Sequence, residues 1–170
     1  MDTAQKSIVL IGMPGAGKST VGILLAKELG LDFIDTDVSI QVQQGKTLQQ
    51  ISDESGYMAV RDCEEQVLLN EDIAGKVVAT GGSAVYSEAG MARLNANATL
   101  IFLDVSLPVL KARVSNFNSR GIARRPDQSF DDLFTERSAL YQQYGDITID
   151  CSHLSIDEAL QAIVAAVISA

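Results

Sequence analysis

Two hydrophobic patterns alternate along this chain: short runs of consecutive apolar residues, and longer stretches in which apolar residues recur every three or four positions. The runs are typical of parallel strands covered on both faces, and the spaced pattern is typical of helices that bury one side. The runs predict strands at residues 7–12, 31–35, 76–80, 98–105 and 146–150. Because helices are predicted between them, we expect a doubly wound α/β fold around a parallel sheet.

The helices predicted from the spaced pattern differ in composition. They are expected at residues 18–30, 87–95, 107–114, 130–144 and 155–168. Residues 38–70 are also mostly helical, with breaks around 45–47 and 55–57, but they are polar and rich in Gln and Glu. We expect a segment with so few apolar anchors to pack at the edge of the sheet as a substrate-binding helical flap.

The composition excludes several classes of partner. At 170 residues and 46% hydrophobic, the chain suits one domain spanning residues 1–170 with a full core. Its formal net charge of −9 argues against nucleic acid or an anionic membrane as a partner, because both require a basic surface. No apolar run approaches the length of a membrane span. We therefore expect a cytoplasmic protein, and a monomer, whose partners are small molecules.

Cysteine and histidine content argues against a zinc site. Cys63 and Cys151 lack metal-ligand spacing, and His153 is the only histidine in the chain. With a polar stretch and no secretory signal before the first strand, we expect reduced thiols, although the sequence alone leaves a disulfide between the two cysteines open.

Residues 8–20, IVLIGMPGAGKST, carry the strongest chemical signal. Gly12, Gly17, Lys18 and Ser19 fill the pattern G-x-x-x-x-G-K-[ST] between a predicted strand and a predicted helix. Such a loop surrounds phosphates with backbone NH groups, while its lysine reaches the β and γ phosphates and its serine binds Mg²⁺. The alternative is a glycine-rich turn with a chance lysine. The predicted nucleotide-binding residues are Gly12, Gly15, Ala16, Gly17, Lys18, Ser19 and Thr20.

Two aspartates follow the second predicted strand. Asp35 and Asp37 stand at its carboxyl end, where open α/β sheets bind ligands. One carboxylate can hold Mg²⁺ through a water while the other orients or deprotonates an attacking hydroxyl. In the alternative, Asp37 caps the next helix and Asp35 is only solvated. The third strand ends without an aspartate, so Asp35 becomes the leading metal ligand beside Ser19.

Other candidate groups are weaker when each is taken alone. Arg61 precedes Glu64 by three residues on a predicted helix, where an ion pair would orient the guanidinium. Gly81 and Gly82 follow the third strand and would let a ligand approach the backbone closely. A surface ion pair and a tight turn are the respective alternatives.

Residues 115–129 break the helical pattern and carry Arg120, Arg124 and Arg125. An arginine-bearing loop beside a nucleotide site is expected to act as a lid that excludes water and brings positive charge to the transferring phosphoryl group. The alternative is an exposed basic linker.

Taken together, these motifs resemble the shikimate kinase family over essentially the whole chain. The P-loop GMPGAGKST, the segment FIDTD, the R-x-x-E of Arg61 to Glu64, the turn TGG, the arginine lid and ERSALY follow the family's order and separations. The resemblance implies a three-layer α/β/α P-loop kinase fold with a five-stranded parallel sheet in the order 2-3-1-4-5. It also implies ATP and Mg²⁺ as cosubstrates, and phosphorylation of the 3-hydroxyl of shikimate to shikimate 3-phosphate.

The resemblance also implies roles for single residues. Asp37 would contact the ring hydroxyls and orient the nucleophile. Arg61 and Arg137 would hold the substrate carboxylate, assisted by the backbone NH of Gly82. Planar guanidinium groups suit a carboxylate because each can donate two parallel hydrogen bonds.

The γ-phosphoryl charge would be stabilised by Lys18 and by one arginine of the lid. Arg120 fits this role best by its separation from Arg137, and Arg124 or Arg125 remain alternatives.

Several positions depart from the family's pattern. Ser83 stands where a third glycine is usual, Val60 replaces a phenylalanine, and the lid reads RGIA where RPLL is common. A late arginine that packs against adenine is missing, and residues 152–154 read SHL instead. These departures leave two alternatives open: a kinase of another small hydroxy acid or sugar acid, and a nucleotide-binding protein without transfer activity.

Overall fold

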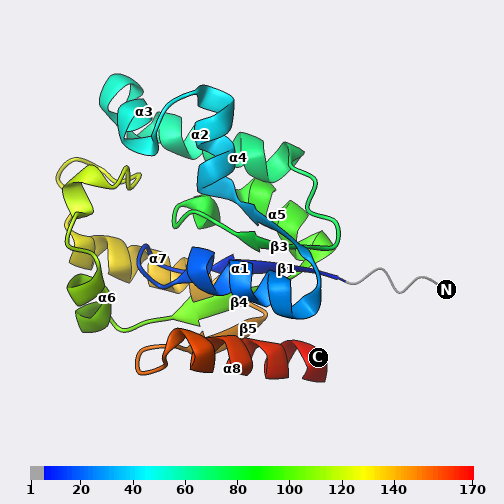
Figure 1. The fold of residues 1–170 in the computed structure, drawn as a ribbon. Helices are drawn as coiled ribbons and strands as arrows, with labels where there is room; N and C mark the ends of the chain where they lie inside the picture. The colour runs from blue at the N-terminus through cyan, green and yellow to red at the C-terminus, as the bar shows by residue number, and fades with distance from the viewer. Residues whose placement is uncertain (1–5) are drawn as a thin grey trace.

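A computed structural model describes residues 6–170, so the first five residues of the expected domain lie outside the described part of the chain. Its centre is a five-stranded parallel sheet in the order β2-β3-β1-β4-β5 (Figure 1). The strands are β1 (Ser7–Ile11), β2 (Asp32–Asp35), β3 (Lys76–Ala79), β4 (Ala98–Asp104) and β5 (Ile147–Asp150). The predicted strands, their parallel pairing and their order are all confirmed.

Helices cover both faces of the sheet, as the predicted fold requires (Figure 1). Helices α1 (Lys18–Leu29) and α8 (Ile156–Ser169) pack against each other on one face, while α5 (Glu88–Asn97) and α7 (Phe130–Tyr144) contact β4 on the other. The remaining helices are α2 (Thr36–Gln44), α3 (Leu48–Ser55), α4 (Tyr57–Asn70) and α6 (Leu107–Arg113), with the 3-10 turns η1 (Ala84–Tyr86) and η2 (Phe117–Ser119).

The breaks predicted within residues 38–70 are real helix ends with local causes. Helix α2 ends where Gly45 adopts a left-handed conformation with φ of 62°, which costs glycine little. Thr47 caps the start of helix α3, because its side chain accepts a hydrogen bond from the backbone of Gln50 in a capping box. Gly56, with φ of 86°, separates α3 from α4.

The apolar side chains form two separate clusters. The larger surrounds β1 and β4, whose residues Val9, Leu10 and Leu100 are fully buried. The smaller joins Ile40, Ile51, Val60 and Val67 of helices α2 to α4 to Ala123 of the lid. The expected substrate-binding segment therefore has a small core of its own, and the lid contributes to it.

No helix within residues 6–170 combines the length and hydrophobicity needed to cross a membrane.

The carboxyl ends of β1, β2 and β3 meet at one edge of the sheet, and α2, α3 and the lid rise beside it (Figure 1). Open α/β sheets bind ligands at this edge. The P-loop, the two aspartates and the Gly81–Gly82 turn all follow strands that end here.

Arg93 links α5 to the end of α4. Its guanidinium donates hydrogen bonds to the carbonyl oxygens of Leu68 at 2.7 Å and Glu71 at 2.8 Å. These carbonyls lie at the helix C-terminus, where the chain supplies no further NH partners and where positive charge is favourable.

We predict that Arg93→Met destabilises the protein by about 1–3 kcal/mol, because two charge-assisted hydrogen bonds are lost. The urea midpoint of unfolding measures the change. Lys111→Met is the control, since Lys111 pairs with Asp131 on the exposed surface and should cost less than about 1 kcal/mol. Equal effects of the two substitutions would contradict the structural role of Arg93.

Candidate functional site

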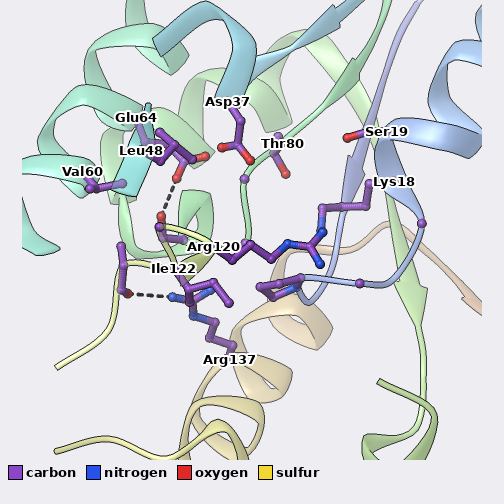
Figure 2. Close-up of a pocket in the computed structure, with 18 of the residues that line it drawn as sticks. Lys18, Ser19, Asp37, Leu48, Val60, Glu64, Thr80, Arg120, Ile122 and Arg137 are labelled. Atoms are coloured by element: carbon purple, nitrogen blue, oxygen red, sulfur yellow. Dashed lines mark hydrogen bonds between the residues drawn. The ribbon is translucent and has the colours of Figure 1, made fainter. Parts of the chain in front are cut away.

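A cavity of about 290 Å³ opens at the carboxyl edge of the sheet (Figure 2). Residues from seven separate segments line it, and the sequence alone could not bring these segments together. They include Gly15, Gly17, Lys18, Ser19 and Thr20 of the P-loop, Asp37, Val60, Glu64, the turn 80–83, residues 120–123 of the lid, and Arg137.

Glycines let the P-loop adopt its shape. Gly15 and Gly17 have φ of 86° and 95°, values that other residues rarely adopt. Glycine is needed at position 12 for a different reason: a Cβ there would lie 2.8 Å from the Leu103 carbonyl oxygen of β4. The loop thus passes closely over the sheet, and α1 begins directly behind it with its N-terminus toward the cavity.

Lys18 is held inside the loop. Its ammonium donates to the carbonyl oxygens of Gly12 at 2.7 Å and Met13 at 2.8 Å. Burial lowers the pKa of Lys18 to about 8, while the negative charge of Asp37 opposes this effect. The lysine remains mostly charged at neutral pH and lies where the motif requires it.

The two aspartates have different surroundings. Asp35 caps α2, since its Oδ1 accepts from the backbone NH groups of Asp37 at 3.0 Å and Val38 at 3.4 Å. Its other oxygen accepts the Ser19 hydroxyl at 2.5 Å. The alternative in which Asp37 caps this helix is wrong. The helix starts two residues earlier than that alternative requires, so Asp37 lies in its first turn and faces the cavity (Figure 2).

Asp37 and Glu64 converge on the turn after β3. A Cβ at Gly81 would lie 2.7 Å from Asp37 Oδ1 and 2.6 Å from Glu64 Oε1, so a larger residue would displace both carboxylates. Burial raises the pKa of Asp37, as does the charge of Asp35, while Lys18 lowers it. Burial, followed by the charge of Asp37, raises the pKa of Glu64 to about 7.

The expected ion pair between Arg61 and Glu64 is not formed, although both residues are among those described. Glu64 points inward and accepts the Ser83 hydroxyl at 2.5 Å and the Thr36 hydroxyl at 3.4 Å. Thr36 in turn accepts the Gly81 NH at 3.0 Å. Glu64 therefore joins α4 to α2 and to the turn after β3 rather than orienting Arg61.

Arg61 and Arg137 approach the same atom. The Arg137 guanidinium donates to the carbonyl oxygen of Ala123 at 2.8 Å, and that of Arg61 contacts this oxygen at 3.5 Å. Arg137 lines the cavity, whereas Arg61 contacts the Ala123 carbonyl oxygen without being part of the cavity wall. A Cβ at Gly82 would lie 2.7 Å from Arg137, so this glycine leaves room for the guanidinium.

The lid arginines differ in what they contact. In Figure 2 the Arg120 side chain extends across the cavity toward Lys18, and its charge lowers the pKa of both Lys18 and Asp37. Arg124 stacks on Phe117 and donates to lid carbonyls, among them that of Gln128 at 2.9 Å. Arg125 pairs with Glu136 at 3.4 Å. Arg120 alone of the three lines the cavity.

The lid departs from the family's pattern at Gly121, where a proline is common, and the surroundings of this glycine explain the difference. Its φ is 69°, and a Cβ there would lie 2.6 Å from Leu48 Cβ, at the start of α3. Its NH donates to the side chain of Gln49 at 2.9 Å. A proline at this position would have neither the conformation nor the hydrogen.

A second cavity, of about 370 Å³, lies on the other side of the P-loop. It is mostly apolar, with Arg113 at its side donating to the Gly15 carbonyl oxygen at 3.3 Å. The other residues that line it are Gly15, Ala16, Gly17, Val21, Cys151, Leu154, Ser155, Ile156 and Ala159. Ala16, predicted to bind nucleotide, faces this cavity rather than the first.

Sequence reasoning missed three residues here. Tyr86 lies between Arg61 and Arg137, which we call the clamp arginines. Ala123 contacts both of them, and Arg113 borders the second cavity. None belongs to a short motif. A tyrosine five residues beyond the strand-end glycine Gly81, in a chain with only four tyrosines, was the one available signal.

Comparisons with known proteins agree with this geometry. A protein-family model described as shikimate kinase matches residues 14–168. The shikimate kinase of Xanthomonas campestris pv. campestris is 34% identical over 163 residues, covering 93% of this chain and 89% of that protein. A shikimate kinase from Acinetobacter baumannii, solved in complex with shikimate, has a TM-score of 0.87 at 27% identity and covers 98% of this chain and 95% of its own.

More distant structures share the fold alone. A gluconokinase from Sinorhizobium meliloti 1021 has a TM-score of 0.56 at 19% identity, covering 98% of this chain and 93% of that one. The family match over most of the length, together with relatives above 30% identity, identifies the family directly: this chain belongs to the shikimate kinase family.

Proposed function

We propose that this protein transfers the γ-phosphoryl group of ATP to the 3-hydroxyl of shikimate, giving shikimate 3-phosphate. Membership of the shikimate kinase family supports the reaction. The cavity supports it as well, because its lining includes the P-loop, Asp37, Arg120 and Arg137.

The observation that carries the proposal is a buried positive charge without an acidic partner. Arg137 is 1% exposed, and among residues 6–170 no carboxylate forms an ion pair with it. Burying an unpaired charge is costly, so such a guanidinium suits an anionic ligand that arrives from solution. A small substrate carboxylate fits this site, with Arg61 as a second donor beside it.

The phosphate end of the cavity suits a nucleotide and Mg²⁺. The P-loop amides and Lys18 would bind the phosphates, and Ser19 and Asp35 offer the oxygen ligands that Mg²⁺ prefers. Mg²⁺ bound there would neutralise negative charge on the phosphates. The apolar second cavity on the far side of the loop would take the adenine base, with Arg113 in place of the arginine missing after β5.

Asp37 would orient the acceptor hydroxyl and accept its proton. Burial raises its pKa, which makes the carboxylate a better proton acceptor than an exposed aspartate, while the charge of Lys18 acts in the opposite direction. Arg120 would complete the positive charge around the transferring group when the lid lies over the cavity.

Release of ADP with shikimate as the only added alcohol tests the function. We expect turnover with ATP and shikimate in a coupled assay, and little with gluconate or other small hydroxy acids. If shikimate gave no turnover at millimolar concentration while another acid did, the acceptor assignment would be wrong. If no acceptor gave turnover, a protein that only binds nucleotide would be favoured instead.

We predict that Asp37→Asn lowers kcat by roughly 10²- to 10⁴-fold, the usual contribution of a general base, and leaves the KM for ATP nearly unchanged. Asp157→Asn, on the exposed first turn of α8, is the matched control. The same ADP assay measures both variants. Normal turnover in Asp37→Asn would refute the role given to this carboxylate.

Glu64 gives a prediction for pH. Because its pKa is raised to about 7 in the folded protein, it binds a proton there that the unfolded chain releases at lower pH. Its contribution to stability is therefore complete below the ordinary glutamate pKa and is lost as pH rises through about 7.

Glu64→Gln removes this titration and keeps an acceptor for Ser83. We expect the melting temperature of the variant to rise relative to the unsubstituted protein between pH 5 and pH 8, by the equivalent of roughly 1–3 kcal/mol. The exposed Glu28→Gln serves as control and should show no such trend. Parallel curves for Glu64→Gln and the unsubstituted protein would contradict the buried, raised pKa.

A further inference from the structure

The two clamp arginines repel each other, so something must hold them side by side. The positive charge of Arg137 lowers the pKa of Arg61, in the same direction as burial does. Neither arginine forms an ion pair with any carboxylate among residues 6–170. The expected Arg61–Glu64 pair, which would have fixed one of them, does not exist.

An aromatic ring occupies the space between them. The guanidinium carbon of Arg61 lies 3.7 Å from the centroid of the Tyr86 ring, within the range of a cation–π contact. Arg61 Nε is buried and has no hydrogen-bond acceptor. The ring face therefore lies against the guanidinium to which this unpartnered nitrogen belongs. Tyr57 stands farther from the same guanidinium, at 5.2 Å.

The hydroxyl of the same tyrosine contacts the other arginine. Arg137 Nε lies 3.4 Å from Tyr86 Oη and is the donor. The hydroxyl itself donates to Glu136 Oε1 at 2.5 Å, which fixes the direction of its lone pairs. Glu136 also accepts from Gln128 at 3.2 Å and pairs with Arg125, so the lid supports this arrangement.

We propose that Tyr86 is the positioning residue of the acceptor clamp. Its ring orients Arg61 and its hydroxyl orients Arg137, so that both guanidiniums direct donors toward one oxygen, as they do at the Ala123 carbonyl. Tyr86 ends the turn η1, which follows directly from β3 and the Gly81–Gly82 turn. The rigid sheet therefore determines where the ring lies. This inference rests on the proposed function, because it assigns the clamp to the acceptor carboxylate.

Two substitutions separate the ring from the hydroxyl. Tyr86→Leu removes both, and we expect the KM for shikimate to rise by roughly tenfold, the scale of a partly desolvated cation–π contact, with kcat and the KM for ATP within about twofold. Tyr86→Phe keeps the ring and should raise this KM by a smaller factor. Tyr144→Leu, at the end of α7, is the matched control and should leave all three constants unchanged.

A measurement without any acceptor tests the positioning itself. Arg61 Nε is bonded to the guanidinium carbon that lies 3.7 Å from the Tyr86 ring centroid, so the resonance of its proton should be shifted upfield by the ring current. We expect this shift in the unsubstituted protein and in Tyr86→Phe, and its loss in Tyr86→Leu. If Tyr86→Leu is too unstable for kinetics, the upfield resonance can still be measured in the unsubstituted protein and in Tyr86→Phe.

The outcomes distinguish the two proposals. If shikimate is turned over but its KM is unchanged in Tyr86→Leu, or if kcat and both KM values change together, the positioning role is overturned and the function stands. If shikimate is not a substrate, the function fails, and the arginine resonance alone decides on Tyr86. Absence of the upfield resonance in the unsubstituted protein overturns the inference in either case.

Discussion

The acceptor half of the site depends on a guanidinium that is buried without a carboxylate to balance it. An isolated charge in a protein interior costs several kcal/mol, and a fold keeps one where a ligand completes it. In a chain with a net charge of −9, Arg137 and Arg61 concentrate positive charge at one point of an otherwise acidic protein. The lid contacts the same two guanidiniums, because the Ala123 carbonyl oxygen lies within reach of both arginines. Under the proposed function, lid position and acceptor binding would therefore share one set of donors.

Close packing at the edge of the sheet lets these charged groups converge. Gly12 allows the P-loop to pass over β4, and Gly81 leaves space for two carboxylates at the end of β3. Gly82 leaves space for Arg137, and Gly121 allows the lid to approach the start of α3. At each of these points a side chain would meet a backbone, carboxylate or guanidinium atom within 3 Å. The absence of side chains is thus as important for the site as the charged residues themselves.

The features predicted correctly from the sequence were those encoded by neighbouring residues. Buried strands and the P-loop depend on local pattern, and the family resemblance gave the order of the strands. The ion pair expected between Arg61 and Glu64 was wrong because it depended on the direction of a side chain, and the choice between the two aspartates as helix cap depended on where the helix starts. Asp35 rather than Asp37 caps α2 because the helix begins at Thr36, and Glu64 turns inward to Ser83 instead of toward Arg61. The site roles assigned to single residues remain predictions.

Two of the departures from the family's pattern, at Ser83 and Gly121, come with new local hydrogen bonds. Ser83 stands where a third glycine is usual, and its hydroxyl donates the shortest hydrogen bond to the buried carboxylate of Glu64. Without this hydroxyl, Glu64 would keep only the longer contact from Thr36. In the lid, Gly121 replaces the chain stiffness of proline with a left-handed turn and a hydrogen bond to α3. Both changes alter the wall of the acceptor pocket while leaving Lys18 and its loop untouched. Under the proposed function, these two substitutions would act on selection of the acceptor rather than on the chemistry of transfer.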